Sequence, residues 1–309
     1  MRVGVIGSSA NEGTANLVER WRAIGIDARL VTGTEALATL RPTDVAVARL
    51  DIRPTLDGIE DGLLAVLRLE RRGIEVMNPA AALLAAHDKL RTARLLAAAH
   101  LPHPATVHAR SAAEIAGPYP FVLKPRFGSW GADVALCGDG ADVARYLTAV
   151  SGTSWFLRHG VLRQELVPNG GHDLRVLVAG GRVAGAIMRI AAPGEWRTNI
   201  SLGGTSASVA LPEGAGELAV TAAIVAGADL VGVDLMPRPD GSLVVIEVNA
   251  AVDFDDQYSF AGEDVYATAG AALGLRPHRR RDRAVSTSHF KPTRWQAGIL
   301  AGAAATDPE

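Results

Sequence analysis

Two apolar stretches toward the C-terminal end of the chain carry oxygen-bearing side chains whose spacing could bind a metal ion. Asp234 lies within Gly232–Met236, and Glu247 and Asn249 lie within Leu243–Asn249. The intervening segment holds two prolines and an Asp-Gly pair, which predicts a tight turn and an antiparallel hairpin. Side chains two residues apart share a strand face, so Glu247 and Asn249 lie together, and cross-strand pairing can add Asp234. Magnesium held jointly with phosphate groups would offset the cost of burying these carboxylates. The alternative is a hairpin with two exposed acids and an asparagine.

Lysine is rare in this chain, which contains Lys89, Lys124 and Lys291 against 28 arginines. Lysine carries a compact charge on a slim stem, whereas arginine ends in a broad planar fork. A narrow phosphate pocket would therefore require lysine. Lys89 follows Asp88, a predicted helix N-cap, and Lys124 lies at the end of the predicted strand Pro120–Pro125. Chance is the alternative, above all for Lys291.

A glycine-rich loop follows the strand that contains Lys124. It includes Gly128, Ser129, Trp130 and Gly131, and a further strand is predicted from Val134. Glycine allows backbone amides to approach phosphates closely, so this loop could cover a nucleotide. A glycine hairpin loop without a ligand is equally compatible with these residues.

The remaining patterns predict the elements that position these side chains. In the first 80 residues, apolar runs alternate with amphipathic segments, which predicts a small parallel α/β sheet. The predicted strands are Arg2–Ile6, Ala28–Val31, Val45–Arg49 and Ile74–Met77, and the predicted helices are Asn11–Ile24 and Glu60–Arg72. Later segments predict a strand that ends at Pro168, a hairpin and two helices. They are Val161–Pro168, Asp173–Ala179 with Arg182–Ile190, Glu213–Gly227 and Glu263–Leu273.

Composition limits the classes of protein to consider. The 309 residues, 48% of them hydrophobic, are enough for two or three lobes with apolar cores. A net charge of −2 predicts no general attraction to nucleic acid or to anionic membranes, and no apolar run is long enough for a membrane span. Cys137 is the only cysteine, and Met1–Gly7 reads as a strand rather than a signal peptide, so we expect a cytoplasmic protein. We expect residues 276–309 to form a mobile tail, or alternatively a basic docking segment.

Four groups of residues, in this order, resemble the ATP-grasp superfamily, and within it the RimK-type and LysX-type amino-acid ligases. These groups are Lys124–Gly131, Asp173–Arg175, Trp196–Gly204, and Asp234 with Glu247–Asn249. The resemblance covers roughly residues 85–275, and the first 80 residues fit the family only by pattern. It implies an α/β protein with α+β lobes, the ATP-grasp fold. The resemblance implies an N-terminal parallel α/β lobe at 1–80, a central lobe with the phosphate flap at 81–155, and a C-terminal lobe with the metal site at 156–275. The central and C-terminal lobes would clamp ATP between them.

The resemblance also implies which residues bind ATP. Lys89 and Lys124 look like the two lysines that contact the phosphates, and Gly128–Gly131 looks like the flap that closes over them. The hinge that pairs with the adenine edge looks like Gln164, Glu165, Leu166 and Val167. Asp173 stands where an acid of the family contacts the ribose.

Further positions match groups that act on the substrates. Arg189 and Asn199 fall where the family holds the transferring phosphate, and we take them as catalytic residues. Arg175 and Arg197 are expected to bind substrate, with a substrate carboxylate the expected partner of Arg197. The metal ligands of the family, for Mg²⁺ or Mn²⁺, match Asp234, Glu247 and Asn249.

Two segments depart from the family pattern. Many ATP-grasp ligases have a Pro-Gly turn after the last metal ligand, whereas Asn249 is followed by a segment nearer the LysX-type ending, with Asp253 and Phe254 as its last two positions. Ile200–Leu202 replaces an arginine-containing segment of LysX-type enzymes, which leaves the amino-acid substrate open. We hypothesise that Asp253 binds the α-ammonium of the incoming amino acid, and a solvated acidic turn is the alternative.

These assignments predict an ATP-dependent carboxylate–amine ligase. ATP converts a carboxylate to an acyl phosphate, and the amine of an amino acid, glutamate-like by resemblance, then forms an amide. The acceptor can be a carrier protein, a peptide or a metabolite, and a homo-oligomer is compatible with the sequence. The alternatives are a small-molecule dipeptide or D-amino-acid ligase, and a non-catalytic nucleotide-binding module with the same fold.

Overall fold

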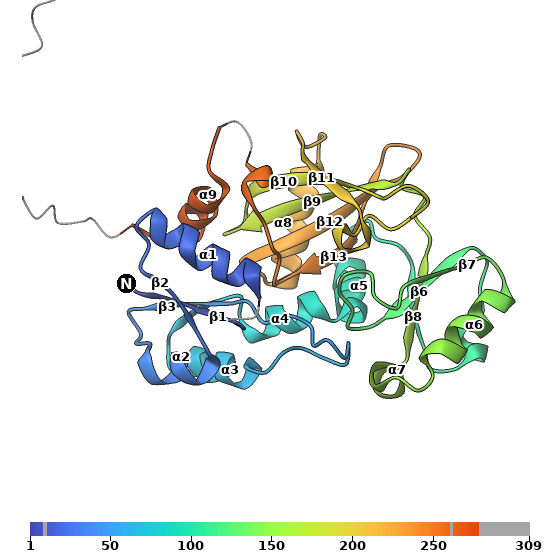
Figure 1. Ribbon diagram of the computed structural model, residues 1–309, viewed down its shortest axis with the longest axis horizontal. Coiled ribbons are helices and arrows are strands. Elements are labelled where there is room, and N and C mark those ends of the chain that lie inside the picture. Colours follow the sequence, from blue (N-terminus) through green and yellow to red (C-terminus); the bar gives the residue numbers. More distant parts are fainter. Residues whose placement is uncertain (9–10, 260–261, 278–309) are drawn as a thin grey trace, which may run out of the picture. The chain divides into compact units, whose positions relative to one another are not determined.

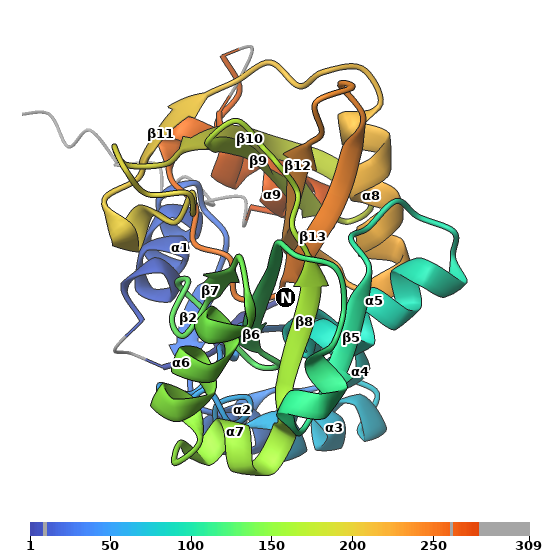
Figure 2. The ribbon, with the colours of Figure 1, turned by 90° about the vertical axis from the view of Figure 1, so that its right-hand side faces the viewer.

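Three β-sheets organise the chain (Figures 1 and 2). The computed structural model describes residues 1–8, 11–259 and 262–277. Its first sheet is parallel, and the second and third sheets are antiparallel. This arrangement agrees with the predicted parallel N-terminal sheet followed by two α+β parts.

The first sheet has the strand order β2-β1-β3-β4. Its strands are β1 (Val3–Ile6), β2 (Ala28–Val31), β3 (Val45–Ala48) and β4 (Glu75–Met77). Strands β1 and β3 are apolar and buried along their whole length, as expected where helices cover both faces of a parallel sheet. Figure 1 shows α1 (Glu12–Ala23) on one side of the strands and α2 (Gly33–Thr39) with α3 (Leu63–Arg71) on the other. The loops after β1 and β3 leave the sheet at its carboxyl edge.

Two consecutive helices, α4 (Ala80–His87) and α5 (Lys89–Ala98), lead out of the first sheet. Asp88 caps α5 by accepting hydrogen bonds from the backbone amides of Leu90 and Arg91 at 3.2 and 3.3 Å, which confirms the predicted N-cap. The same carboxylate accepts two bonds from the guanidinium of Arg126, at 2.7 and 2.5 Å. The cap thus fixes Lys89 at the first position of the helix and beside the segment that enters the glycine loop.

The second sheet has the order β5-β8-β6-β7. Its elements are β5 (Thr106–Ala109), β6 (Phe121–Pro125), β7 (Ala135–Cys137) and β8 (Val161–Glu165), with the 3₁₀ turn Ala112–Ile115 and helices α6 (Gly140–Val150) and α7 (Ser154–His159). The predicted boundary between residues 155 and 156 put β8 in the C-terminal lobe. The structure instead pairs β8 with both β5 and β6, so the second sheet continues to Glu165.

The third sheet has the order β11-β10-β9-β12-β13. Its strands are β9 (His172–Ala179), β10 (Arg182–Ile190), β11 (Thr205–Ser208), β12 (Leu230–Pro237) and β13 (Leu243–Asn249), and the 3₁₀ turns Ile200–Leu202 and Asp256–Tyr258 flank it. Both predicted hairpins are present, β9 with β10 and β12 with β13. A bulge lets Asp234 pair with Glu247 while Leu235 pairs with Val245, which adds one residue to β13 at this point.

Helices complete the third part of the chain. The alanine-rich helix α8 (Ala215–Ala226) packs on β9, β12 and β13, and α9 (Val265–Ala272) packs on β9 and β10. Among the described residues, no helix is long and apolar enough to cross a membrane. Apart from Arg276 and Pro277, the predicted mobile tail lies outside the described residues.

Candidate active site

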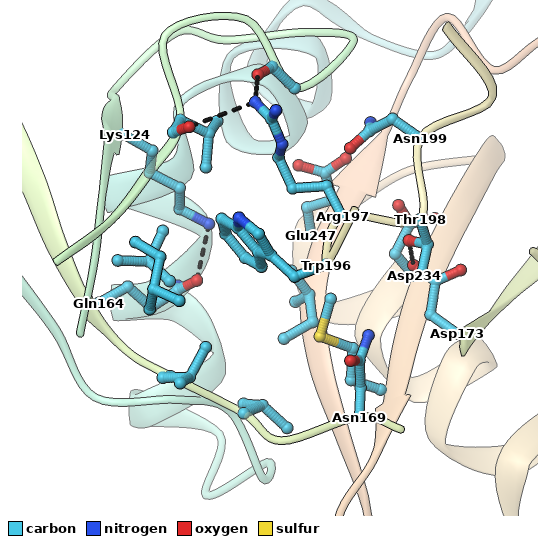
Figure 3. A pocket seen from close by; sticks show the side chains of 18 of the residues that line it. Lys124, Gln164, Asn169, Asp173, Trp196, Arg197, Thr198, Asn199, Asp234 and Glu247 are labelled. Carbon is cyan, nitrogen blue, oxygen red and sulfur yellow. Dashed lines mark hydrogen bonds between the residues drawn. The ribbon is translucent and has the colours of Figure 1, made fainter. Parts of the chain in front are cut away.

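A cavity of about 300 Å³ lies between the second and third sheets (Figure 3). In the figure, Lys124 and Gln164 border one side, Asp173, Thr198 and Asp234 border the other, and Trp196 lies inside. Many of the predicted site residues line this first cavity. They are Lys89, Lys124, Gly128, Ser129, Trp130, Gly131, Gln164, Glu165, Leu166, Val167, Asp173, Arg189, Arg197, Asn199, Asp234 and Glu247.

A second cavity of about 400 Å³ adjoins the first. It is lined by the three other predicted residues, Arg175, Asn249 and Asp253. The residues that line both cavities come from the flap, from β10 and the loop after it, and from β13. They are Ser129, Trp130, Arg189, Asn199 and Glu247. The chain therefore brings all the predicted site residues to one pair of connected spaces.

Asp234 and Glu247 of the β12–β13 hairpin are not exposed, contrary to the alternative considered from the sequence. Asp234 is buried and lies opposite Glu247 in the strand register. The side-chain amide of Asn249 donates to Glu247 Oε1 at 3.2 Å. Burial opposes the charge of Glu247, but Lys89, Lys124 and Arg175 outweigh burial and hold the pKa of this carboxyl well below its usual range. The hairpin therefore presents two carboxylates and an amide close together.

The two lysines reach the first cavity in different ways. Lys89 Nζ donates to the carbonyl of Gly128 in the flap at 2.8 Å and pairs with Glu247 Oε2 at 2.8 Å. Lys124 is only 5% exposed, and its Nζ donates to the side-chain oxygen of Gln164 at 2.7 Å. Burial, followed by the charge of Lys89, lowers the pKa of Lys124 to about 8. An added anion near Lys124 would stabilise its charged form.

Asp173, for which the resemblance implies a contact with ribose, makes several contacts within the protein. It is 1% exposed, and its two oxygens accept bonds from Arg189 at 2.8 and 2.6 Å. Thr198 Oγ1 also donates to Asp173 at 2.6 Å. The carboxylate is therefore engaged in holding Arg189 and the loop that carries Thr198. Thr198 was missed from the sequence, although its place between Arg197 and Asn199 could have drawn attention to it.

The predicted substrate arginines are also engaged within the protein. Arg175 makes two bonds of 2.7 Å to the carboxylate of Asp234, and Arg189 adds a third at 2.7 Å. Arg197 donates to the carbonyls of Gly131 and Val134 at 3.0 and 3.3 Å, so it joins its own loop to the flap. These contacts place Arg197 on the flap side of the first cavity.

The donor set fits a magnesium ion that shares its coordination with phosphate. Among the described residues, no group of three or more histidine, cysteine or acidic side chains could hold a metal ion by itself. A metal ion here would therefore need other oxygen ligands in addition to two carboxylates. Asp234 and Glu247 supply two carboxylates and Asn249 supplies an amide oxygen, and these hard oxygen ligands suit magnesium completed by phosphates and water. Lys89, Arg175 and Arg189 balance the two carboxylates in this structure.

Comparisons with known proteins agree with this geometry. Residues 86–268 match the model of the RimK-like ATP-grasp domain. A protein of Thioalkalivibrio sulfidiphilus named "Probable alpha-L-glutamate ligase" is 31% identical over 309 residues, which cover 92% of this chain and 99% of that protein.

Solved structures support the same fold. A RimK domain ATP-grasp protein from Sphaerobacter thermophilus aligns over 88% of this chain and 99% of its own, with 24% identity and a TM-score of 0.62. The ATP-grasp ligase PsnB, solved with a minimal precursor, Mg and ADP, aligns over 88% of this chain and 97% of its own, with 18% identity and a TM-score of 0.62. The predicted ATP-grasp fold is therefore confirmed, and the chain belongs to the RimK-like ATP-grasp family of ADP-forming ligases.

Proposed function

We propose that this protein is an ATP-dependent carboxylate–amine ligase that joins a glutamate-like amino acid to a carboxylate of a protein, peptide or metabolite in the cytoplasm. The observation that carries the proposal is that Arg189, Asn199 and Glu247 line both cavities. A nucleotide in the first cavity and the substrates in the second would meet at these three side chains. Such positioning lowers the entropic part of the barrier to phosphoryl transfer.

The first cavity has the charges that a nucleotide needs. Lys89 and Lys124 would contact its phosphates, and the flap carbonyl of Gly128 already fixes the direction of the Lys89 side chain. The residues from Gln164 to Val167 would pair with the adenine edge. Bound magnesium, held by Asp234, Glu247 and Asn249 together with phosphate oxygens, would offset negative charge on the phosphates.

The reaction has two steps. A carboxylate oxygen of the acceptor attacks the γ-phosphorus, the bond to the β,γ-bridging oxygen breaks, and ADP leaves. The neutral amine nitrogen then attacks the acyl carbon, the bond from that carbon to the phosphate oxygen breaks, and inorganic phosphate leaves with the proton that the nitrogen releases. Arg189 stabilises the transferred phosphoryl group, while Asp173 and Thr198 keep its guanidinium oriented.

Exclusion of water protects the acyl phosphate from hydrolysis. The flap and the loop after β10 are joined by Arg197 to Gly131 and by Ser201 Oγ, which donates to the Trp130 carbonyl at 2.9 Å. These two contacts connect the segments on either side of the place where the cavities meet. We assign to this pair of segments the role of a cover over the reacting groups.

The full chain can be tested by measuring ATP turnover with magnesium, each of the twenty amino acids, and a cell extract as the source of acceptor carboxylates. We expect ADP and phosphate to form in a manner that depends on both an amino acid and the extract. Formation of AMP, or ATP turnover that no amino acid stimulates, would contradict the proposal. Nucleotide binding without turnover would instead favour the non-catalytic module.

A further inference from the structure

The second cavity includes a residue from outside the matched ATP-grasp domain. Asp51 follows β3 of the first sheet and lines the second cavity together with Asp253. Arg49, which is only 1% exposed, connects the two regions by donating to the Val252 carbonyl at 2.7 Å and to Asp253 Oδ1 at 2.9 Å. The N-terminal part of the chain therefore forms one wall of this cavity.

The charges that face the second cavity do not balance. They come from the acids Asp51, Glu247, Asp253 and Asp255 and from the cations Arg175 and Arg189. Glu247 pairs with Lys89. Arg175 pairs with Asp234, and Arg189 pairs with both Asp173 and Asp234, so neither arginine neutralises Asp51, Asp253 or Asp255.

Arg49 is a cation that interacts electrostatically with both Asp51 and Asp253. It pairs with Asp253, and within the described part of the chain no ion pair includes Asp51. The Asp51 carboxylate accepts a hydrogen bond from the Ile52 amide at 2.7 Å. Burial, followed by the charges of Glu60 and Asp253, raises the pKa of Asp51 to about 6, as expected of a carboxyl short of positive partners. The wall formed by Asp51 and Asp253 therefore favours a positively charged ligand.

We propose that Asp51 and Asp253 together form the binding site for the ammonium group of the amine substrate, so that the N-terminal part of the chain selects for a substrate that carries this group. The inference rests on the proposed ligase function, because that function requires an amine beside the acyl phosphate. The cavity is open to the reacting groups, since Arg189, Asn199 and Glu247 line it as well. An ammonium placed between Asp51 and Asp253 would restore charge balance on this wall.

The test compares binding of L-glutamate with binding of glutarate, which lacks the amine, to the full chain in the presence of Mg²⁺ and ADP. We expect Asp51→Asn to weaken L-glutamate binding by about tenfold or more, the usual loss for a charged hydrogen bond, and to leave glutarate binding unchanged. Asp256→Asn is the matched control, because Asp256 is exposed, pairs with Arg20 and lines neither cavity. Isothermal titration calorimetry gives the affinities.

Three outcomes would overturn the inference. They are unchanged L-glutamate binding in Asp51→Asn, an equal loss for L-glutamate and glutarate, and failure of the parent protein to bind L-glutamate. ATP binding is measured on the same samples. A protein that binds ATP but no amine refutes the ammonium site alone, whereas a protein that does not bind ATP refutes the ligase proposal itself.

Discussion

At the residue scale, the candidate site is a series of alternating charges that runs from the start of α5 across the strands of the third sheet. Each carboxylate in it contacts at least one cation, so no acid of the series is buried without a partner. The series consists of Lys89, Glu247, Arg175, Asp234, Arg189 and Asp173. When phosphates and magnesium bind, the cations of this series could pair with the phosphates while its carboxylates bind magnesium. No buried charge would then be left without a partner.

The first residue-scale prediction concerns Lys124. The Lys124→Arg variant keeps the charge but places a planar fork where a nearly buried ammonium meets Gln164 at 2.7 Å. We expect the dissociation constant for ATP, measured by calorimetry, to rise by about tenfold or more, which is about 1.4 kcal/mol. Lys291→Arg, in the segment outside the described residues, is the same substitution and should leave ATP binding unchanged. Equal ATP affinity in both variants would refute the narrow-pocket argument.

The second residue-scale prediction concerns pH. The pKa of Asp51 is about 6 in the folded chain against an ordinary value of 3.8, so the folded state holds this proton more tightly than the unfolded state does. Ionised Asp51 therefore costs stability as the pH rises through this window, and the cost is complete above pH 6. Asparagine does not ionise, so Asp51→Asn should stabilise the protein more at pH 8 than at pH 5, by about 1 kcal/mol.

Urea denaturation at the two pH values measures this difference. Asp256→Asn, the same substitution at an exposed carboxyl outside both cavities, is measured beside it as the control. A stability gain for Asp51→Asn that is the same at pH 5 and pH 8 would show that Asp51 does not carry the raised pKa.

The residue types in the sequence predicted which residues form the site better than they predicted the contacts between those residues. Asp234 and Glu247 could be placed together because a hairpin fixes which residues face each other. The partner of Asp173 could not be predicted, because Arg189 lies on another strand and Thr198 on a loop, and the sequence gives no distances between them. Asp51 had no motif at all, and only the fold brings it to the second cavity.

At the element scale, the flap depends on a glycine in the left-handed region. Gly131 has φ +71°, and a Cβ there would lie 2.8 Å from the side-chain oxygen of Asn199. Gly73 also has φ +71°, but a Cβ there would meet nothing within 4 Å. A substitution at Gly73 therefore tests backbone strain alone, whereas a substitution at Gly131 tests backbone strain together with a collision with Asn199.

We therefore predict different effects of Gly131→Ala and Gly73→Ala. Both should lose roughly 1–2 kcal/mol of stability, because alanine disfavours a positive φ. Only Gly131→Ala should also lower kcat/KM for ATP, because its methyl group would move Asn199 or the flap. Thermal unfolding and steady-state kinetics measure the two effects. An equal loss of activity in both variants would contradict a specific role for the flap.

The sequence pattern predicted well which segments form helices and which form strands. It did not predict correctly to which sheet every strand belongs. The predicted helix Asn11–Ile24 corresponds to α1, and the period-two runs of the third sheet became its hairpins. Strand β8 was assigned to the wrong part because it follows α7 along the chain but pairs with β5 and β6, which precede that helix. Pairing between strands so far apart is decided by packing, and local pattern does not report it.

At the scale of the whole molecule, the described residues as far as Pro277 form one compact unit. The first sheet belongs to this unit, and the residue Asp51 that follows β3 lines the second cavity. Asn78, at the end of the first sheet, accepts from the amides of Asp229 and Leu230 at 2.7 and 2.9 Å and donates to the Leu230 carbonyl at 2.8 Å. Arg49 makes a second connection, to Val252 and Asp253. These buried contacts fix the N-terminal sheet against β12 and against the segment after β13.

The most direct test of the central claim is magnesium-dependent formation of ADP by the Glu247→Gln variant. The substitution is nearly isosteric, so the fold should survive while one negative oxygen and the pairing with Lys89 are lost. Glu217→Gln, on the exposed face of α8, is the matched control. We predict that Glu217→Gln turns over ATP like the parent, and that Glu247→Gln unfolds at a similar temperature but forms no ADP at any magnesium concentration. Full magnesium-dependent turnover by Glu247→Gln would contradict the account.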